Sequence, residues 1–127
     1  MSNNKKTEER YSQKDLDEFD ALIDDKLAIA NEQLQFYRTQ IAELSEKGEE
    51  KVNEITDSSP TFELDRLSEL ALRQEKLIKH LENAKLRIKN KVYGICRETG
   101  KLISKERLRA VPHATLSVHA KEKRNRR

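Results

Sequence analysis

The sequence predicts a mainly α-helical protein: a long antiparallel coiled-coil hairpin, followed by a small finger-like globular knob and a terminal helix. Two long segments repeat apolar residues at spacings of three and four, which is typical of helices that pack along a narrow seam. Charged residues make up 39% of the chain and aromatic residues only 5%. Such a composition supplies too little apolar surface for a large spherical core, and it favours elongated helices.

Residues 1–11 are polar and lack apolar periodicity, so they are predicted to form a disordered tail. The first helix is predicted to start after Ser12, a favourable N-cap, with Asp15 placing a negative charge where the helix dipole favours it. Its seam consists of Leu16, Phe19, Ile23, Leu27, Ala30, Leu34, Tyr37, Ile41 and Leu44. At 1.5 Å per residue this helix is about 50 Å long. Gly48 supplies a stop signal at its end.

Residues 49–59 lose the period, gather Asn, Asp, Ser and Thr, and are predicted to form a turn. A second helix is predicted to start here, with Ser59 at the N-cap and Pro60 at the first helical position. The second seam consists of Leu67, Leu70, Gln74, Leu77, Leu81, Ala84 and Ile88. Residues 12–90 are therefore expected to form an antiparallel hairpin with its tip at about 48–60. Gln74 falls within this seam, and two interpretations are equally favoured: a buried polar pair with the region around Asn31, or a partly exposed side chain.

Charge is distributed unevenly along the chain, although its net value is only +3. Residues 43–65 hold eight acids and two lysines, a net −6, whereas residues 66–91 hold eight basic residues and three acids, a net +5. The last seven residues hold five basic residues and one acid, a net +4, and residues 122–127 are assigned to a basic tail. Such asymmetry predicts a preferred docking orientation.

Residues 91–121 carry turn signals and are predicted to form the knob, which Tyr93, Gly94 and Cys96 open. A short helix is expected from Ser104 to Ala110, with Pro112 as its stop, and a last helix is expected over residues 113–123. The spacing resembles the C-terminal finger of the DksA/TraR family of bacterial transcription factors, which act on RNA polymerase. The residues that fall at the family's positions without a gap are Tyr93, Gly94, Cys96, Gly100, Arg107, Leu108, Ala110, Pro112, Ala114, Leu116 and Lys121. The resemblance extends back through residues 76–79 and Glu82 in the second helix.

In the family this finger usually binds zinc through two Cys-x-x-Cys pairs. This chain has a single cysteine, Cys96, and the other three positions hold Thr99, Ser117 and Ala120. None of these three side chains supplies the thiolate that a four-cysteine site requires. No zinc is therefore expected.

His113 and His119 offer an alternative ligand set with Cys96, but neither stands at a lost cysteine position and no fourth ligand is evident. We expect Cys96 to be a small buried apolar residue and both histidines to lie at the surface. An apolar core must then replace the folding free energy of a metal. Its candidate residues are Val92, Tyr93, Ile95, Leu102, Ile103, Leu108, Val111, Leu116 and Val118.

The resemblance implies a regulator that binds RNA polymerase directly. In the family the hairpin enters the secondary channel of the polymerase, and acidic residues at its tip act near the catalytic centre. An ungapped register places the two family acids on Asn53 and Thr56, neither of which is acidic. Glu54 and Asp57 lie one residue further on. These four residues are the candidate effectors, and for Glu54 and Asp57 the reading as ordinary solvated turn residues is equally open.

The family also responds to the alarmone ppGpp in the stringent response, through basic side chains beside the finger. The matching positions here are His80, Val111 and Lys121. Only Lys121 keeps a fixed positive charge. His80 and Lys121 are retained as candidate residues for the polymerase rim or the alarmone side, and the sequence does not predict a ppGpp response.

No catalytic constellation stands out, because the chain has no Gly-rich phosphate loop and no His-Glu-x-x-His motif, so an enzyme is not expected. A single cysteine excludes internal disulfides and fits a reducing compartment. We find neither a secretion signal nor an apolar run that could span a bilayer. We therefore expect a cytoplasmic monomer without a membrane partner.

Two other functions compete with this interpretation. A nucleic-acid- or ribosome-associated coiled-coil protein would use residues 121–127 as a phosphate-binding arm. The knob lacks an aromatic platform and a recognition helix, so sequence-specific DNA binding is not expected. A structural coiled-coil adaptor would explain the hairpin but not the spacing in the knob.

Overall fold

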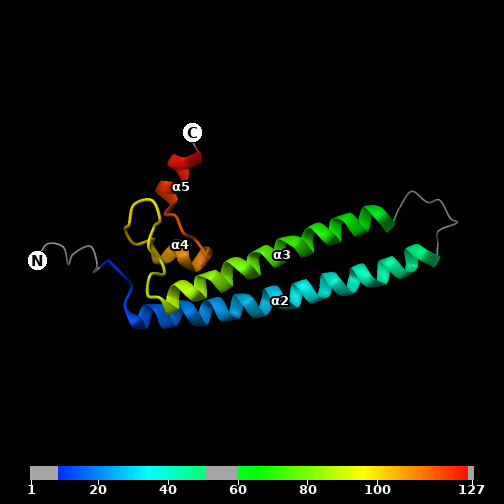
Figure 1. Cartoon of the computed structure of the whole chain (residues 1–127), viewed down its shortest axis with the longest axis horizontal. Coiled ribbons are helices and arrows are strands. Elements are labelled where there is room, and N and C mark those ends of the chain that lie inside the picture. Colours follow the sequence, from blue (N-terminus) through cyan, green and yellow to red (C-terminus); the bar gives the residue numbers. More distant parts are fainter. Residues whose placement is uncertain (1–8, 51–59, 126–127) are drawn as a thin grey trace, which may run out of the picture. The chain divides into compact units, whose positions relative to one another are not determined.

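The computed structural model describes residues 9–50 and 60–125, and these residues form four helices: α2 (Gln13–Glu50), α3 (Pro60–Lys89), α4 (Lys105–Ala110) and α5 (Val118–Asn125) (Figure 1). In this part of the chain, β structure is limited to an isolated antiparallel bridge between Ile95 and Leu102. The predicted mainly α-helical fold with a long helical hairpin is therefore confirmed.

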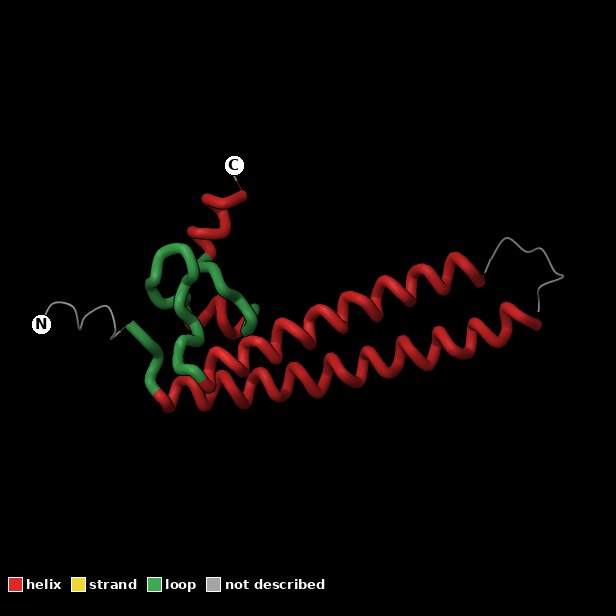
Figure 2. The backbone as a smooth tube through the Cα atoms, in the orientation of Figure 1, coloured by secondary structure: helices red, strands yellow, loops and turns green. Residues whose placement is uncertain are grey.

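The chain divides into two compact units. We call residues Leu27–Lys79 the hairpin unit, and Met1–Lys26 together with His80–Arg127 the knob unit. Segments of α2 and α3 lie side by side in each of them (Figure 2). None of the helices within residues 9–50 and 60–125 combines the length and the apolar character needed to cross a membrane.

The start of α2 follows the prediction, because the backbone N–H of Asp15 donates to the Ser12 hydroxyl at 3.1 Å. Its end differs from the prediction. The helix continues past Gly48 to Glu50, so Gly48 is an interior residue of the helix rather than its stop. A glycine inside a helix costs about 1 kcal/mol relative to alanine, which the rest of a long helix can offset.

The buried residues of the hairpin unit are Ala30, Leu34, Leu67 and Ala71. The first three belong to the predicted seams, whereas Ala71 does not, and its predicted neighbour Leu70 is only half-buried. Gln74 is half-buried, and the described residues contain no buried polar side chain, so partial exposure is the correct interpretation of this position. Arg38 and Glu75 form an ion pair at 3.1 Å between α2 and α3. Because both side chains are largely exposed, this pair contributes about 0–1 kcal/mol.

The knob unit holds a larger core, in which the finger packs against the two long helices. Helices α2 and α3 contribute Leu16, Phe19, Ile23, Leu81, Ala84 and Ile88, and the finger contributes Tyr93, Cys96, Ile103, Leu108, Ala114 and Ala120. The ring of Tyr93 lies 5.4 Å from that of Phe19, and its hydroxyl donates to the Pro112 carbonyl at 2.7 Å. One aromatic residue thus ties α2, the start of the finger and its proline turn together.

The chain leaves α3 through Lys91, which adopts a positive φ of 62°, and enters the finger at Gly94, with φ 79°. Backbone bonds then close the finger turn: Ile103 N–H donates to Gly94 O, and Cys96 N–H donates to Lys101 O, each at 2.7 Å. Ser104 is the N-cap of α4, and its hydroxyl accepts from the Arg107 N–H at 3.2 Å. This capped start agrees with the expected short helix before Pro112.

Two segments at the ends of the described chain differ from the predictions. Tyr11 was assigned to the disordered tail, but it is half-buried in the knob unit, with its ring 5.7 Å from that of Phe19. Residues 1–8 of the tail lie outside the described residues. At the other end, the last helix starts at Val118 rather than at residue 113 and includes residues 122–125, which were assigned to the basic tail.

Candidate functional site

The four positions that correspond to zinc-binding cysteines come together in the finger. Ser117 lies next to Cys96, with 3.7 Å between Oγ and Sγ and with its backbone N–H donating to Sγ at 3.4 Å. The Ser117 hydroxyl also accepts from the Ala120 N–H at 3.1 Å, so it caps the start of α5. Thr99 and Ala120 line the same small cavity beside α5. The four predicted finger positions are therefore close neighbours in the structure.

These side chains do not fit a zinc ion. The site offers one thiol, two hydroxyl groups and a methyl group, whereas a structural zinc site takes four thiolate or imidazole ligands. In residues 9–50 and 60–125, no cluster of three or more His, Cys, Asp or Glu side chains could hold a metal ion. The alternative set of Cys96 with two histidines is not assembled either, because His113 stacks on His80 and His119 lies exposed on α5.

Cys96 is buried, with only 1% of the residue exposed, and yet its thiol is unusually acidic. Burial raises the pKa of this thiol, but hydrogen bonds from the Thr99 hydroxyl and from the backbone N–H groups of Ser117, Thr99 and Glu98 outweigh burial and lower the pKa to about 6. Backbone N–H groups that surround a sulfur stabilise its thiolate form. The prediction that Cys96 is a buried apolar filler therefore captures its burial but not its hydrogen bonds.

His113 is half-buried, which corrects the prediction that it lies at the surface. Its ring stacks on that of His80 at a centroid distance of 5.4 Å and an interplanar angle of 8°. Its Nδ1 atom is buried without a hydrogen-bond partner. Burial, then the neighbouring His80, Arg87 and Arg107, lower the pKa of His113, so the neutral ring is favoured. Sequence reasoning missed this because the contact joins α3 to a loop 33 positions further along the chain.

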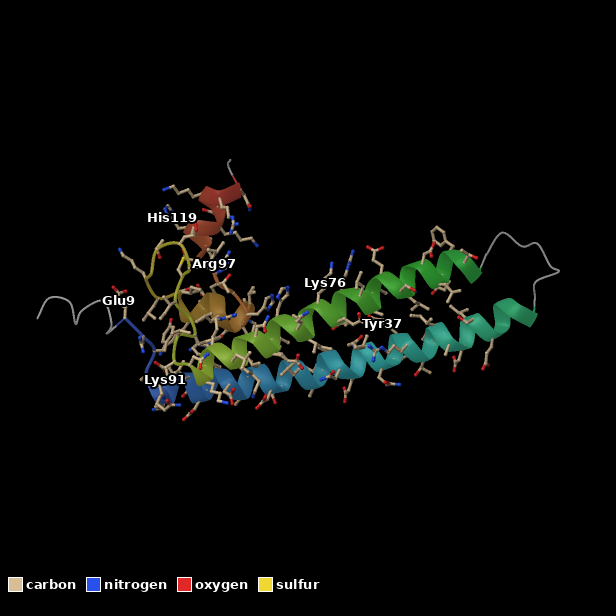
Figure 3. The ribbon with its side chains drawn as sticks, viewed as in Figure 1. Glu9, Tyr37, Lys76, Lys91, Arg97 and His119 are labelled. Atoms are coloured by element: carbon tan, nitrogen blue, oxygen red, sulfur yellow. The ribbon has the colours of Figure 1, made fainter. Side chains whose placement is uncertain are left out.

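The two candidate residues for the rim or alarmone side lie on different elements. His80 is on α3 against His113, and Lys121 is an exposed residue of α5 whose backbone N–H donates to Ser117 O. Within the described part of the chain, no hydrogen bond or ion pair joins them. Figure 3 shows His119 on α5 and Arg97 in the finger loop beside it.

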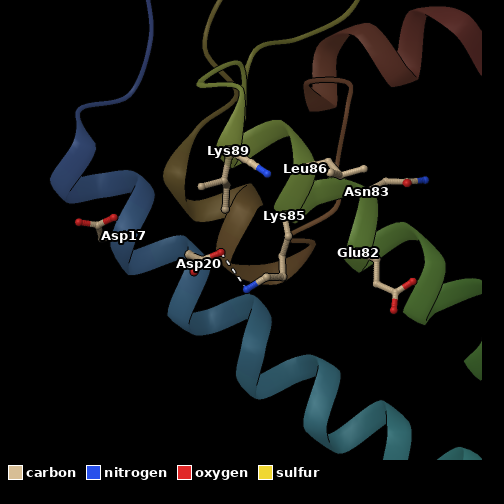
Figure 4. Close-up of a pocket in the computed structure, with 8 residues that line it drawn as sticks. Asp17, Asp20, Glu82, Asn83, Lys85, Leu86 and Lys89 are labelled. Carbon is tan, nitrogen blue, oxygen red and sulfur yellow. Dashed lines mark ion pairs between the residues drawn. The ribbon is translucent and has the colours of Figure 1, made fainter.

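A groove of about 620 Å³ in the knob unit lies between the start of α2 and the end of α3 (Figure 4). Leu86 lines it and is 57% exposed. Lys85 crosses from α3 to Asp20 at 3.1 Å, and it also pairs with Asp24. The sequence analysis did not predict this groove. Leu86, an apolar residue outside the predicted seam, is the feature of the sequence that could have indicated it.

The four candidate tip residues, Asn53, Glu54, Thr56 and Asp57, lie outside the described residues. Their assignment as effectors remains a prediction from the sequence.

A helical hairpin followed by a compact finger places the chain in a class of coiled-coil proteins with a finger-like knob. The family model described as the prokaryotic dksA/traR C4-type zinc finger matches residues 91–126. The chain is 46% identical over 67 residues to the RNA polymerase-binding transcription factor DksA of Caulobacter vibrioides. This match covers 51% of this chain and 47% of that protein. Together these matches confirm that the chain resembles the DksA/TraR family, with the family model matching at its finger.

Two further comparisons agree with this resemblance. The chain is 34% identical over 62 residues to general stress protein 16O of Bacillus subtilis, a match that covers 47% of this chain and 38% of that protein. The solved structure of transcription factor DksA2 from Pseudomonas aeruginosa matches with a TM-score of 0.52 and 26% identity over 84% of each chain. The chain spans less than half the length of these curated relatives, at 47% and 38%.

Proposed function

We propose that this protein is a transcription regulator that binds RNA polymerase directly and alters initiation. The observation that carries the proposal is the 46% identity to a protein named as an RNA polymerase-binding transcription factor. The finger match at residues 91–126 and the helical hairpin support it, because they are the two structural parts that the family combines. A role as a cytoplasmic monomeric regulator, rather than as an enzyme, follows from this proposal.

In the proposed mechanism, the hairpin enters the secondary channel of the polymerase and presents its tip near the catalytic centre. Helices α2 and α3 pair through an apolar seam in the hairpin unit, so together they form a support for the segment that connects them. We assign the effector role to Glu54 and Asp57, with Asn53 and Thr56 as the alternative at the family's own register. Carboxylates there would act by charge near the reacting centre and need no catalytic partner of their own.

The knob unit is the proposed grip on the polymerase. Residues 91–125 contain nine basic and three acidic side chains, a net +6, whereas α2 contains four basic and eleven acidic side chains, a net −7. Such a separation of charge favours one orientation of docking and disfavours the reverse. His80 and Lys121 belong to this proposed contact region, and the exposed Leu86 beside the groove offers an apolar contact in it.

Neither zinc nor ppGpp is part of the proposal. The finger positions do not fit a zinc ion, as described above. Three positions match the alarmone site. Val111 is apolar, and His80 stacks on His113, whose lowered pKa favours the neutral ring. Lys121 is therefore the one fixed positive charge among the three. We therefore propose a regulator whose effect on the polymerase does not require ppGpp.

Fluorescence anisotropy with the labelled protein tests the proposal against its main alternative. Core RNA polymerase, duplex DNA and ribosomes are titrated separately at about 0.15 M salt, where non-specific phosphate contacts are weakened. We expect saturable binding to the polymerase and little binding to DNA or to ribosomes. Tighter binding to DNA or ribosomes than to the polymerase would instead support a nucleic-acid- or ribosome-associated protein that uses its basic C-terminal residues.

A further inference from the structure

Tyr11 contacts the finger from the segment that precedes α2. Its hydroxyl donates to the backbone carbonyl of Ile103, a residue 92 positions away in the sequence. Its ring meets that of Phe19 edge to face, and Phe19 in turn packs on Tyr93. Burial raises the pKa of the Tyr11 hydroxyl, so this group stays protonated and remains a donor at neutral pH.

The finger turn is shaped to receive this ring. A Cβ atom added at Gly94 would lie 2.7 Å from Cε2 of Tyr11 and 3.2 Å from a methyl group of Leu108. Gly94 also has φ 79°, which side chains rarely adopt, so both its space and its backbone angle require glycine. Because the Ile103 N–H donates to the Gly94 carbonyl at 2.7 Å, Tyr11 contacts both arms of this turn at the point where they are joined.

A charged pair frames the same ring. The Nζ atom of Lys105, in the first turn of α4, lies 5.9 Å from the centroid of the Tyr11 ring and 3.0 Å from a carboxylate oxygen of Asp15 in α2. A lysine held over an aromatic ring gains a cation–π attraction. Tyr11 is thus in contact with α2, with the finger turn and with α4.

We infer that Tyr11 is a latch that closes the finger, in the place of the metal that a C4-type zinc finger uses. A zinc site cross-links the two halves of a finger through its thiolates, and here the equivalent positions offer one thiol and no metal site. The Cys96–Ser117 hydrogen bonds hold the first half to the start of α5, and Tyr11 holds the turn and α4 from the other side. Closure of this finger therefore depends on a residue outside it, at the N-terminal side of α2.

Cys96 gives a direct measurement of closure, because it is the chain's single cysteine and is buried in the closed finger. Under conditions where a thiol reagent reacts slowly, its labelling rate is proportional to the fraction of molecules with an open finger. We expect Tyr11→Ala to speed the labelling of Cys96 by about 100-fold, since a packed aromatic ring is lost. Tyr11→Phe, which lacks only the hydroxyl, should speed it by about fivefold.

Tyr37→Ala is the matched control, since it removes a half-buried tyrosine from the hairpin unit, and Cys96 should then be labelled at the wild-type rate. Each rate is measured with added zinc and with a chelator, and wild-type labelling should be the same in both. A wild-type rate in Tyr11→Phe and Tyr11→Ala would overturn the inference. So would chelator-dependent labelling of the wild type, because the finger would then be closed by metal. If Tyr11→Ala does not fold, Tyr11→Phe alone decides the outcome.

Discussion

The hairpin unit and the knob unit are built from the same two helices but differ in how they are stabilised. Of the sixteen buried apolar residues in the described chain, four lie in the hairpin unit and twelve in the knob unit. The hairpin unit also exposes Ile29, Phe36, Phe62 and Leu72. Most of the apolar burial that stabilises the fold is thus in the knob unit.

This difference indicates where each unit tolerates change. A seam one or two residues wide leaves most side chains of the hairpin unit in solvent, where substitutions rarely alter stability by more than about 0.5 kcal/mol. In the knob unit, buried residues such as Tyr93 contact more than one element, so a substitution there affects both the finger and a long helix. We therefore expect substitutions in the core of the knob unit to lower the stability of the fold. Substitutions in the hairpin unit should leave stability nearly unchanged and alter only function.

The largest expected effect is at Leu108, which is 0% exposed and packs in α4 against the finger turn. Leu108→Ala should lower the free energy of unfolding by about 2–5 kcal/mol, because it removes buried methyl groups and leaves a cavity. Chemical denaturation followed by circular dichroism measures the change. We also expect weaker binding to RNA polymerase, since the proposed grip is the knob unit.

Leu72→Ala is the control for this substitution, because it makes the same change at a leucine of the hairpin unit that is 49% exposed. Its effect should stay within about 0.5 kcal/mol. Equal losses in the two variants would contradict the claim that the two units are stabilised differently.

A smaller loss is expected at Ser104, the N-cap of α4. Its hydroxyl accepts from the Arg107 N–H at 3.2 Å, and Ser104→Ala leaves that donor without its partner. Replacing such a cap costs about 0.5–2 kcal/mol. The exposed Ser68 lies inside α3, so Ser68→Ala should be neutral or slightly stabilising, because alanine is the better helix former. Thermal unfolding of the two variants in parallel measures both effects.

Mild acid should destabilise the knob unit, since it contains all three histidines of the chain. Burial and the nearby His80, Arg87 and Arg107 lower the pKa of His113 in the folded state. The unfolded chain therefore takes up this proton first as the pH falls. The stability that neutral His113 allows is fully present above about pH 6.5 and is lost progressively as the pH falls below that value, toward the lower folded pKa.

Urea unfolding at pH 7.5, 6.5 and 5.5 tests this direction. Cys96 also makes the protein less stable in acid, because its pKa in the folded state is lowered to about 6. The stabilisation that the folded state gives to the thiolate is lost as the pH falls toward that value. We therefore compare the wild type with His113→Asn, which keeps the thiol. The stability of the variant should fall less steeply with acid, and an identical pH dependence would show that the pKa of His113 does not differ between the folded and unfolded states.

The sequence predicted the elements that are set by local spacing. The seams of α2 and α3, the N-cap at Ser12 and the short helix that follows Ser104 depend on residues close together in the chain. Tyr11 and His113 were misplaced for a different reason. Their partners, Ile103 and His80, lie 92 and 33 positions away, so their burial is a tertiary effect that no periodicity records.

The smallest effect on stability is expected at the predicted tip, where the effect on transcription should be largest. Glu54→Ala combined with Asp57→Ala changes two residues of a polar connecting segment, so the free energy of unfolding should change by less than about 0.5 kcal/mol. Polymerase binding should be largely retained, since the knob unit is intact. What should be lost is the change in transcription from a promoter with a short-lived open complex, measured in vitro with purified polymerase. The pair Asn53→Ala and Thr56→Ala is the matched control: if it abolishes the effect while the carboxylate variant keeps full activity, the effector residues lie at the family's own register and the assignment to Glu54 and Asp57 is wrong.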